Sequence, residues 1–265
     1  MTFAADTSVV RIGQGVYRGQ IGDGWTVRGH TNGGYLLCIA LRAILDATGH
    51  PDPVTVTGHF LEPPKAAALT VDVQALRKGR RFATASAVVR DDPGTALVHA
   101  VATVGDLEHL DEPVVYATDA PPDLPPTGQC VEHLLPGGRG RPVQVLLHPA
   151  DAGFVHGRPS GAARLRGWFR LTDGEPYDTA AIAAVADSFP PTVYNLGLPR
   201  TWVATLELTV HVRARPAPAG WLRAAFETTF VGTKLLDVQG TVWDEQDRLV
   251  ARSRQLAVLY REIGT

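Results

Sequence analysis

The sequence predicts an α+β fold with two antiparallel sheets, each wrapped around a long central helix. Three observations support this prediction. Residues 31–49 read as a helix that is apolar on nearly every side, as expected for a helix buried in a core. Short segments of alternating apolar and polar residues follow at close intervals, without intervening helices. The second half of the chain repeats this order of one helix and four strands.

The first helix, TNGGYLLCIALRAILDATG, carries signals for both of its ends. Thr31 or Asn32 can act as the N-cap, and Gly49 can end the helix in the left-handed conformation. The glycine pair Gly33-Gly34 leaves the first backbone N–H groups uncovered, and such groups can bind an anion or a developing oxyanion. We therefore expect Asn32, Gly33 and Gly34 to contact a substrate. The two glycines could equally serve only a tight entry turn or close packing.

The remaining pattern divides the chain into two domains. In the first half, strands are expected at residues 54–61, 69–76, 82–90 and 96–104. In the second half, a helix capped by Asp178 is expected at residues 179–188, with strands at 143–147, 163–171, 202–213, 221–231, 235–244 and 249–260. Between the halves, residues 107–142 are rich in Pro and Gly. We therefore predict domains at 1–106 and 143–265, joined by a linker at 107–142.

Composition excludes several classes of protein. The 265 residues are 45% hydrophobic and 20% charged, with a net charge of −2, so the chain has no electrostatic footprint for nucleic acid. The first residues lack the basic and apolar regions of a signal peptide, and no apolar run reaches membrane-spanning length. The two cysteines, Cys38 and Cys130, do not suggest a disulfide framework. We expect a cytoplasmic protein.

Several segments together resemble a known family. In the first half these are NGGYLLCIALRA, VTVTGHFLEPP and LRKGRRFATA, and in the second half VADSFPP, WVATLELTVHV and VARSRQLAV. In this order they resemble the acyl-CoA thioesterases built as two fused hotdog domains. The resemblance covers most of the chain outside the linker and implies a double hotdog fold. It also implies an enzyme of fatty acid metabolism that hydrolyses a fatty or related acyl-CoA to the free acid and CoA.

The resemblance further implies three catalytic residues. The positions that match the family's Asp, Thr and Gln are Asp187, Thr205 and Gln255, which would bind and polarise the water that attacks the thioester. This sequence departs from the better-known members after Asp187, where Phe189-Pro190-Pro191 ends the helix early. That difference bears on the shape of the acyl tunnel. The chemistry requires no metal and no cofactor.

The residues themselves support these roles to different degrees. A carboxylate on the Ala-rich helix that holds Asp187 needs partners, although Asp187 could also cap the following turn or face solvent. Gln255 lies on the inward face of its strand, where it could serve a site or merely satisfy a backbone group. Alternation places Thr205 on the outward face with Glu207, so it reaches a site only if it precedes the regular pleat or lies at a bulge.

The first half lacks this set of residues. An offset of 152 residues, which superimposes His59 on His211, places Pro53 at the position of Thr205 and Thr103 at that of Gln255. We therefore expect one active site per chain, with the first half as its structural partner. Two fused domains already supply the pair that single-domain relatives obtain by dimerising, so monomer and homodimer both remain open.

Two other functions compete with thioester hydrolysis. A non-catalytic acyl-CoA-binding protein could keep the same fold and bind the ligand without turnover. A hydratase acting on enoyl-CoA would require an Asp and a His poised together for acid–base chemistry. The sequence shows no such pair near Asp187, so the hydratase ranks last.

Overall fold

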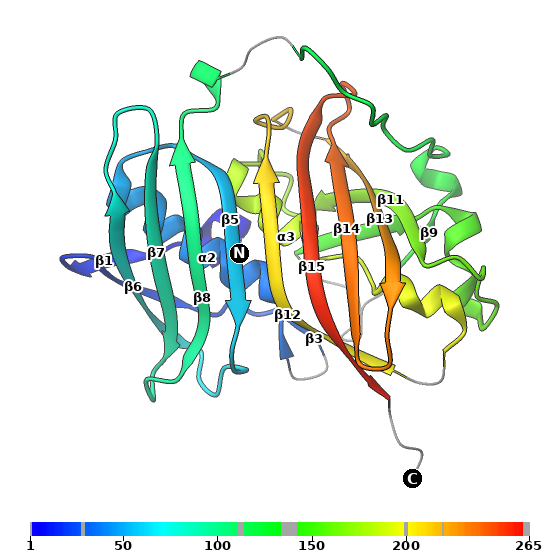
Figure 1. The fold of residues 1–265 in the computed structure, drawn as a ribbon, viewed down its shortest axis with the longest axis horizontal. Coiled ribbons are helices and arrows are strands. Elements are labelled where there is room, and N and C mark those ends of the chain that lie inside the picture. Colours follow the sequence, from blue (N-terminus) through cyan, green and yellow to red (C-terminus); the bar gives the residue numbers. More distant parts are fainter. Residues whose placement is uncertain are drawn as a thin grey trace.

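The computed structural model describes residues 2–27, 30–110, 114–133, 142–198, 201–218 and 220–261. Its main feature is one antiparallel sheet of 13 strands, in the order β1-β2-β6-β7-β8-β5-β12-β15-β14-β13-β11-β10-β9. A small second sheet pairs β3 with β4. Figure 1 shows that the large sheet runs across the whole molecule, with α2 packed against its N-terminal part.

The strands agree closely with the predicted segments. In the first half they are β1 (Val10–Gly13), β2 (Val16–Gln20), β3 (Thr26–Val27), β4 (His30–Thr31), β5 (Asp52–Phe60), β6 (Ala68–Arg77), β7 (Ala83–Asp91) and β8 (Ala96–Gly105). In the rest of the chain they are β9 (Val131–Glu132), β10 (Val143–Leu147), β11 (Arg164–Leu171), β12 (Thr201–Val212), β13 (Leu222–Val231), β14 (Leu235–Trp243) and β15 (Leu249–Arg261).

The helical segments are fewer and mostly short. The α-helices are α1 (Phe3–Asp6), α2 (Gly33–Thr48) and α3 (Ile182–Ala186). The 3₁₀ helices are η1 (Glu108–Leu110), η2 (Thr127–Gln129), η3 (Pro149–Asp151), η4 (Gly153–His156), η5 (Thr179–Ala181) and η6 (Thr192–Leu196). Within the described residues, no helix combines the length and apolar character that crossing a membrane requires.

Helix α2 begins and ends where its sequence signals predict. The Asn32 side chain caps the N-terminus by accepting a hydrogen bond from the Tyr35 N–H at 2.8 Å. Gly49 ends the helix with φ of 72°, a conformation that glycine adopts without strain. From Gly34 to Ile44 the helix is buried at every residue except Arg42, with Leu37 and Ile39 at 0% exposure. This helix is the centre of the N-terminal core, as predicted.

The prediction of two separate sheets is wrong. Strand β5 of the first half pairs antiparallel with β12 of the second half, so the two sets of strands form one continuous sheet. Thr57 lies directly opposite Thr209, with their hydroxyl oxygens 2.8 Å apart. From β5 outward the strands of the first half follow in the order β8, β7, β6. From β12 outward those of the second half follow in the equivalent order β15, β14, β13. The predicted repeat is therefore present, but its two copies share a sheet through their first strands.

The second central helix is shorter than predicted. Asp178 caps it as expected, by accepting a hydrogen bond from the Ala181 N–H at 2.9 Å. The helix then consists only of η5 and the five residues of α3. Pro190 and Pro191 explain the early end, because proline lacks an N–H donor and disfavours helical backbone in the residue before it. Asp187 consequently lies at the C-cap, beyond the regular helix.

The predicted linker, residues 107–142, contacts the C-terminal half. Its strand β9 pairs with β10 at the edge of the sheet. The carbonyl of Pro125 accepts a hydrogen bond from the Trp168 indole at 3.0 Å, and Asp119 pairs with Arg252 at 2.6 Å. The division at 106 and 143 remains a prediction.

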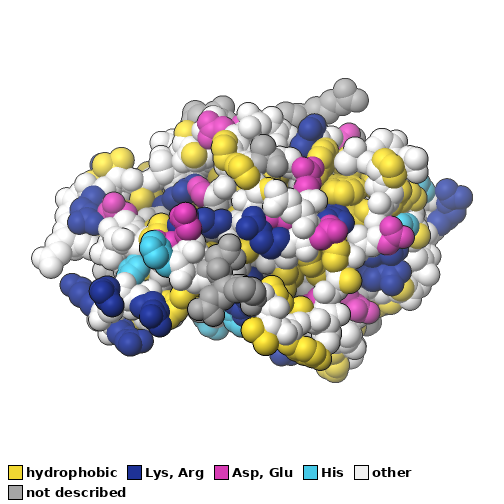
Figure 2. Space-filling model, turned by 90° about the horizontal axis from the view of Figure 1, so that it is seen from above, with side chains coloured by type: hydrophobic (Ala, Val, Ile, Leu, Met, Phe, Trp, Pro, Cys, Tyr) yellow, Lys and Arg dark blue, Asp and Glu magenta, His cyan; other side chains and the backbone are white. Residues whose placement is uncertain are grey.

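An ion pair between the buried Asp52 and the partly exposed Arg215 joins the two halves at the start of β5. Asp52 is only 3% exposed. Its carboxylate accepts hydrogen bonds from Arg215 at 2.8 Å and from the Thr179 hydroxyl and the Leu107 N–H at 2.9 Å each. This end of the sheet is seen from above in Figure 2, where acidic, basic and histidine side chains are interspersed. Asp52 thus links β5 to η5 and to the loop after β12.

Replacing Asp52 should therefore destabilise the whole chain. In Asp52→Ala the Thr179 hydroxyl and the Leu107 N–H lose their buried acceptor, whereas the partly exposed Arg215 keeps Asp106 and Glu108 as partners. Leaving a buried donor unpaired typically costs about 1–3 kcal/mol. Urea unfolding of Asp52→Ala and of the unchanged protein measures the loss in the free energy of unfolding. The control is Asp46→Ala, which removes an exposed pair with Arg11 and should cost about 1 kcal/mol or less. Equal losses in the two variants would contradict a linking role for Asp52.

Candidate active site

A cleft opens where β5 and β12 separate. The two strands pair only as far as His59 and Glu207, after which β12 continues to its N-terminal end paired with β15 alone. Strand β5 ends at Phe60, and the next four residues, 61–64, line the cleft. The resulting cavity has a volume of about 880 Å³ and is lined by residues of both halves. It reaches from the N-terminus of α2 to the inner faces of β15, β14 and β13.

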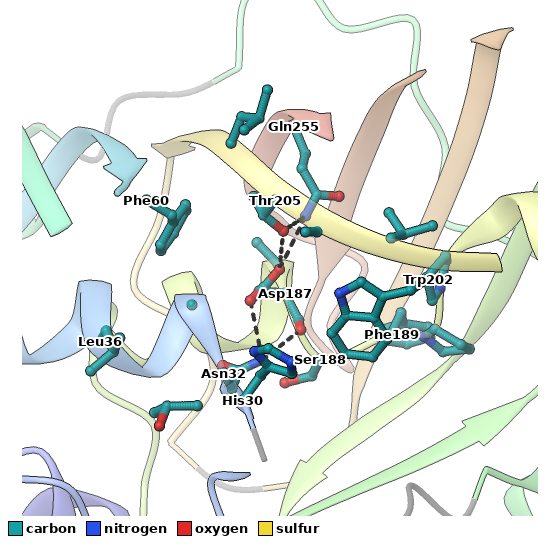
Figure 3. Close-up of a pocket in the computed structure, with 18 of the residues that line it drawn as sticks. His30, Asn32, Leu36, Phe60, Asp187, Ser188, Phe189, Trp202, Thr205 and Gln255 are labelled. Atoms are coloured by element: carbon teal, nitrogen blue, oxygen red, sulfur yellow. Dashed lines mark hydrogen bonds between the residues drawn. The ribbon is translucent and has the colours of Figure 1, made fainter. Parts of the chain in front are cut away.

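The three predicted catalytic residues meet inside this cleft. The Gln255 amide nitrogen donates to Asp187 Oδ1 at 3.1 Å and lies 2.6 Å from the Thr205 hydroxyl oxygen. The same hydroxyl lies 3.5 Å from Asp187 Oδ1. Figure 3 shows the carboxylate of Asp187 pointing toward the other two side chains. A carboxylate, an amide and a hydroxyl from α3, β15 and β12 thus surround one point.

A β-bulge brings Thr205 to this point. Thr205 pairs with Ala257 and Glu207 pairs with Leu256, so Leu206 is an extra residue in β12. Because of the bulge, Thr205 and Gln255 face the same side of the sheet, whereas strict alternation would turn Thr205 outward with Glu207. Of the two conditions under which the sequence predicts that Thr205 reaches the site, the structure shows the bulge.

The other carboxylate oxygen of Asp187 faces the N-terminus of α2. Asp187 Oδ2 accepts hydrogen bonds from the Gly34 N–H at 2.9 Å and from the Asn32 amide at 3.1 Å. The Asn32 amide also donates to the Asp187 backbone carbonyl at 2.9 Å. The first turn of α2 therefore binds an anion, as its sequence predicts, but in this structure the anion is a carboxylate of the protein itself.

These surroundings act on the acidity of Asp187 in opposite directions. Burial disfavours the charged form and raises the pKa of Asp187 to about 6. The N–H groups of Gly34 and Gly33, together with the side chains of Thr205 and Gln255, stabilise the carboxylate and lower that pKa. The result is a carboxyl group that is largely ionised at neutral pH yet basic enough to accept a proton.

Gly34 is required for this contact. A Cβ atom at this position would lie 2.5 Å from the Ala183 carbonyl oxygen and 2.7 Å from the Asp187 Cβ. No side chain fits, because α2 and α3 approach each other through their backbones here. Gly33 is similarly restricted, since its Cβ would lie 2.7 Å from the Phe60 ring. The glycine pair thus serves both close packing and the binding of a carboxylate.

Aromatic side chains form much of the cleft wall, and among them the sequence had drawn attention to Phe189, through the early end of its helix. The rings of His30 and Trp202 are 5.1 Å apart, and those of Phe189 and Phe226 are 4.8 Å apart. Phe60 lines the cleft from the end of β5. The inward alternation of residues 54–61 could have pointed to Phe60 alone, because the other rings come from distant segments.

Both halves carry a bulge at the equivalent point of their first strand. In β12 it lies between Thr205 and Glu207, and in β5 it lies between Pro53 and Thr55, 152 residues earlier. Pro53 therefore occupies the position of Thr205, as predicted. A proline has no hydroxyl, so the first half lacks this part of the site.

Equivalent residues of the last strands, β8 and β15, are one residue further apart in the sequence than those of the first strands. The bulged strands pair with Ala257 in the second half and with Val104 in the first, which is an offset of 153. The counterpart of Gln255 is consequently Ala102, and the prediction that Thr103 holds this position is wrong. The reason is that the second copy has one more residue between its first and last strands. Ala102 is 1% exposed and has no hydrogen-bonding side chain.

No metal site accompanies the cleft in the described part of the chain. Among those residues, no group of three or more His, Cys, Asp or Glu side chains could hold a metal ion. Cys38 is also unsuited to act as a nucleophile: burial raises the pKa of its thiol to about 12, and the thiol donates to the Ala180 carbonyl at 3.1 Å.

Comparison with known proteins assigns the family. Residues 21–105 match the family model of the acyl-CoA thioesterase N-terminal domain, and residues 115–259 match that of the C-terminal domain. The chain belongs to the acyl-CoA thioesterase family. The two matches together include all six site residues predicted from the sequence.

Similar proteins share the fold over nearly their whole length. A candidate thioesterase II from Thermobifida fusca YX is 29% identical, with 98% of each chain covered and a TM-score of 0.88. A protein of unknown function with a hot dog fold from Alicyclobacillus acidocaldarius is 23% identical, again with 98% of each chain covered and a TM-score of 0.83. An uncharacterized protein of Mycobacterium tuberculosis is 28% identical, covering 92% of this chain and 91% of its own. This acyl-CoA thioesterase family member therefore has a hotdog fold.

Adding a methyl group at Gly34 tests how closely the backbones of α2 and α3 approach each other. Gly34→Ala should lower the free energy of unfolding by about 1–3 kcal/mol, because the backbones must move apart to admit the Cβ. Thermal or urea unfolding measures the change. Gly128→Ala serves as the control, since a Cβ there meets nothing within 4 Å and should leave stability nearly unchanged. A neutral Gly34→Ala would show that the contact is looser than described.

Proposed function

We propose that this protein hydrolyses acyl-CoA thioesters to a free acid and CoA, with Asp187 as the general base. The observation that carries the proposal is the convergence of Asp187, Thr205 and Gln255 inside a largely apolar cleft. Family membership supports it, because the chain matches both domains of the acyl-CoA thioesterases. The proposal includes two fused hotdog domains as the scaffold and a fatty or related acyl group as the substrate.

In the proposed reaction, one water molecule binds between Asp187, Thr205 and Gln255. Asp187 takes a proton from this water while the water oxygen forms a bond to the thioester carbonyl carbon. The carbonyl oxygen becomes an oxyanion, and the tetrahedral intermediate then collapses with cleavage of the carbon–sulfur bond. The proton passes from Asp187 to the departing thiolate of CoA, so the carboxylate is regenerated.

The first turn of α2 has two roles in this proposal. Asn32 and Gly34 fix the orientation of the Asp187 carboxylate through their hydrogen bonds. With Gly33, they also form the positive end of a buried 16-residue helix, which would stabilise negative charge developing on the substrate. Each half of the chain thus contributes to one reaction centre.

The site's chemistry argues against a hydratase. Acid–base addition of water to an enoyl-CoA would use an Asp and a His together. Among the described residues, the Asp187 carboxylate receives hydrogen bonds from Asn32, Gly33, Gly34, Thr205 and Gln255, and none of these is a histidine. A cytoplasmic location and a role in fatty acid metabolism remain part of the proposal, which leaves monomer and homodimer both open.

Removing the charge of Asp187 tests the central role. Asp187→Asn should lower kcat for acyl-CoA hydrolysis by about 10²–10⁴-fold, because a neutral amide cannot accept the proton from water. Release of free CoA by the purified protein provides the assay. Asp72→Asn, which alters a carboxylate on an exposed ion pair with Arg90, is the matched control and should retain full turnover.

If Asp187→Asn turns over as fast as the unchanged protein, Asp187 is not the base. If the unchanged protein binds acyl-CoA but releases no CoA, the protein is a binder instead of a hydrolase. Circular dichroism and thermal unfolding of each variant establish that any loss of turnover does not reflect loss of the fold.

The pH dependence of kcat/KM provides a second test. The base must be ionised to accept a proton, so activity should fall as pH drops through the Asp187 pKa of about 6 and be constant above about pH 7. Gln255→Met removes a hydrogen bond that lowers this pKa, so the inflection should move to higher pH. A profile that is flat from pH 5 to pH 8, or an unmoved inflection in Gln255→Met, would assign the base to another group.

A further inference from the structure

Two stacked aromatic residues hold the first turn of α2. Asn32, whose side-chain amide binds Asp187, donates its backbone N–H to the Trp25 carbonyl at 2.8 Å. The Trp25 ring stacks on the Tyr35 ring, with centroids 4.6 Å apart and an interplanar angle of 12°. Tyr35 directly follows Gly34 in α2. Trp25 therefore contacts the residues on both sides of the glycine pair that faces the carboxylate.

Asp6 of helix α1 binds the polar groups of both rings. Its carboxylate accepts a hydrogen bond from the Trp25 indole at 3.3 Å, and its backbone carbonyl accepts one from the Tyr35 hydroxyl at 2.7 Å. Asp6 is 7% exposed, Trp25 is 2% exposed and Tyr35 is 0% exposed. Buried Tyr and Trp side chains usually have such partners. One residue near the start of the chain thus supports the pair of rings.

We propose that Asp6 is a positioning residue for thioester hydrolysis: through the two rings it fixes the first turn of α2, and so the direction of the Asp187 carboxylate. This inference rests on the proposed function. Within the described part of the chain Asp6 does not line the cleft, so it would act without touching the substrate. It also lies before residues 21–105, which match the N-terminal domain of the family. The support therefore comes from a segment in front of the matched domain.

Helix α1 is itself anchored to both halves of the chain. The Phe3 N–H donates to the Asp173 carboxylate in the second half at 2.6 Å. The Phe3 ring meets the Trp25 ring edge-on, with centroids 5.6 Å apart. The Thr7 hydroxyl, just after α1, accepts a hydrogen bond from Arg42 of α2 at 3.2 Å. These contacts fix α1, and with it the carboxylate that accepts from the indole.

The segment after β2 packs against the same group of side chains. A Cβ at Gly22 would lie 2.8 Å from the Asp6 carboxyl carbon, so a side chain there would have to displace the carboxylate. The Gly22 N–H donates to the Tyr35 hydroxyl at 2.8 Å. This hydroxyl thus accepts from one backbone group and donates to another. Hydrogen bonds on both sides hold the Tyr35 ring in one orientation.

A small displacement of this turn would affect the base. The Asn32 amide donates to Asp187 Oδ2 at 3.1 Å, and the Gly34 N–H donates to the same oxygen at 2.9 Å (Figure 3). Such bonds weaken steeply when their geometry departs from the preferred range. A misplacement of about 1 Å can lower a rate by about 10²-fold even when its cause is remote from the chemistry. The support should therefore act on kcat more than on KM.

Variants that break the contact between Asp6 and Trp25 test this inference. Asp6→Leu cannot accept from the indole, and Trp25→Phe keeps a ring beside Tyr35 but cannot donate. Each should lower kcat for acyl-CoA hydrolysis by about tenfold, and in Asp6→Leu KM should change by less than about twofold. Asp6→Asn retains an acceptor oxygen and should recover most of kcat. In the Trp25→Phe background Asp6→Leu should have no further effect, because both changes remove the same hydrogen bond.

The pH profile separates positioning from a loss of stability. The N–H groups of Gly34 and Gly33 lower the Asp187 pKa, so loosening the turn should raise that pKa above about 6. The acid limb of kcat/KM should then move to higher pH in Asp6→Leu and stay in place in Asp6→Asn. A second titratable group near Asp187, the Cys38 thiol, has a pKa of about 12 and stays neutral over this range. An unmoved limb in Asp6→Leu, or an equal fall of kcat in Asp6→Asn, would overturn the positioning role.

Asp244→Ala is the matched control. Asp244 is also a buried carboxylate, 1% exposed, and accepts hydrogen bonds from the N–H groups of Gln246 and Arg248 at 3.0 and 3.1 Å. It follows the end of β14 that is remote from Val238 of the cleft wall, about 20 Å away along the strand. Asp244→Ala should unfold at a lower temperature but keep kcat and the acid limb unchanged. An equal loss of kcat in Asp244→Ala and Asp6→Leu would show that turnover follows overall stability, and would overturn the inference.

Failure of the proposed function would give a different result. If the unchanged protein releases no CoA from any acyl-CoA, the Asp187 pKa is measured directly by NMR titration of ¹³C-labelled aspartate carboxyl groups, with Asp187→Asn identifying the signal. A higher Asp187 pKa in Asp6→Leu than in the unchanged protein would support the positioning role in a protein that binds without hydrolysis. Equal values in the two proteins would overturn it.

Discussion

The contact between the Asp187 carboxylate and the N-terminus of α2 is the interaction on which the site depends. It joins the end of the short second helix to the start of the long first helix, so the two halves of the chain meet at one charged group. The carboxylate is a buried anion, and only the oriented N–H groups of α2 and the amide and hydroxyl donors make it tolerable there. The glycine pair at the start of α2, the early end of α3 and the bulge in β12 all serve this one contact.

The repeat has diverged in a way that fits a single site. In the second half, Thr205 and Gln255 supply polar groups to the cleft. In the first half the equivalent positions hold Pro53 and Ala102. Near that proline, Asp52 is neutralised by Arg215 and by the Thr179 hydroxyl, so this carboxylate stabilises the contact between the halves. One copy of the repeat thus holds the candidate reaction centre, while the other uses its carboxylate to hold the halves together.

Much of the fold could be predicted from local sequence, because caps, prolines and alternating patterns act within a few residues. Both ends of α2 and nearly all strands of the two halves follow from such signals. The pairing of β5 with β12 could not be predicted, since two strands with inward alternation carry no information about which edges join. The approach of Gly34 to Asp187 spans 153 residues, and only the resemblance to a family suggested that distant site residues meet. Alternation alone places Thr205 on the wrong face of β12, and only the bulge turns it toward the site.

The sharing of one sheet also determines how the molecule can come apart. The ladder between β5 and β12 lies in the middle of the sheet, and its hydrogen bonds are as much part of the sheet as those within either half. Either half on its own would present its first strand as an unpaired edge, a known starting point for self-association. Because the two copies lie on one chain, each first strand finds its partner within the same molecule, and neither is left as an edge.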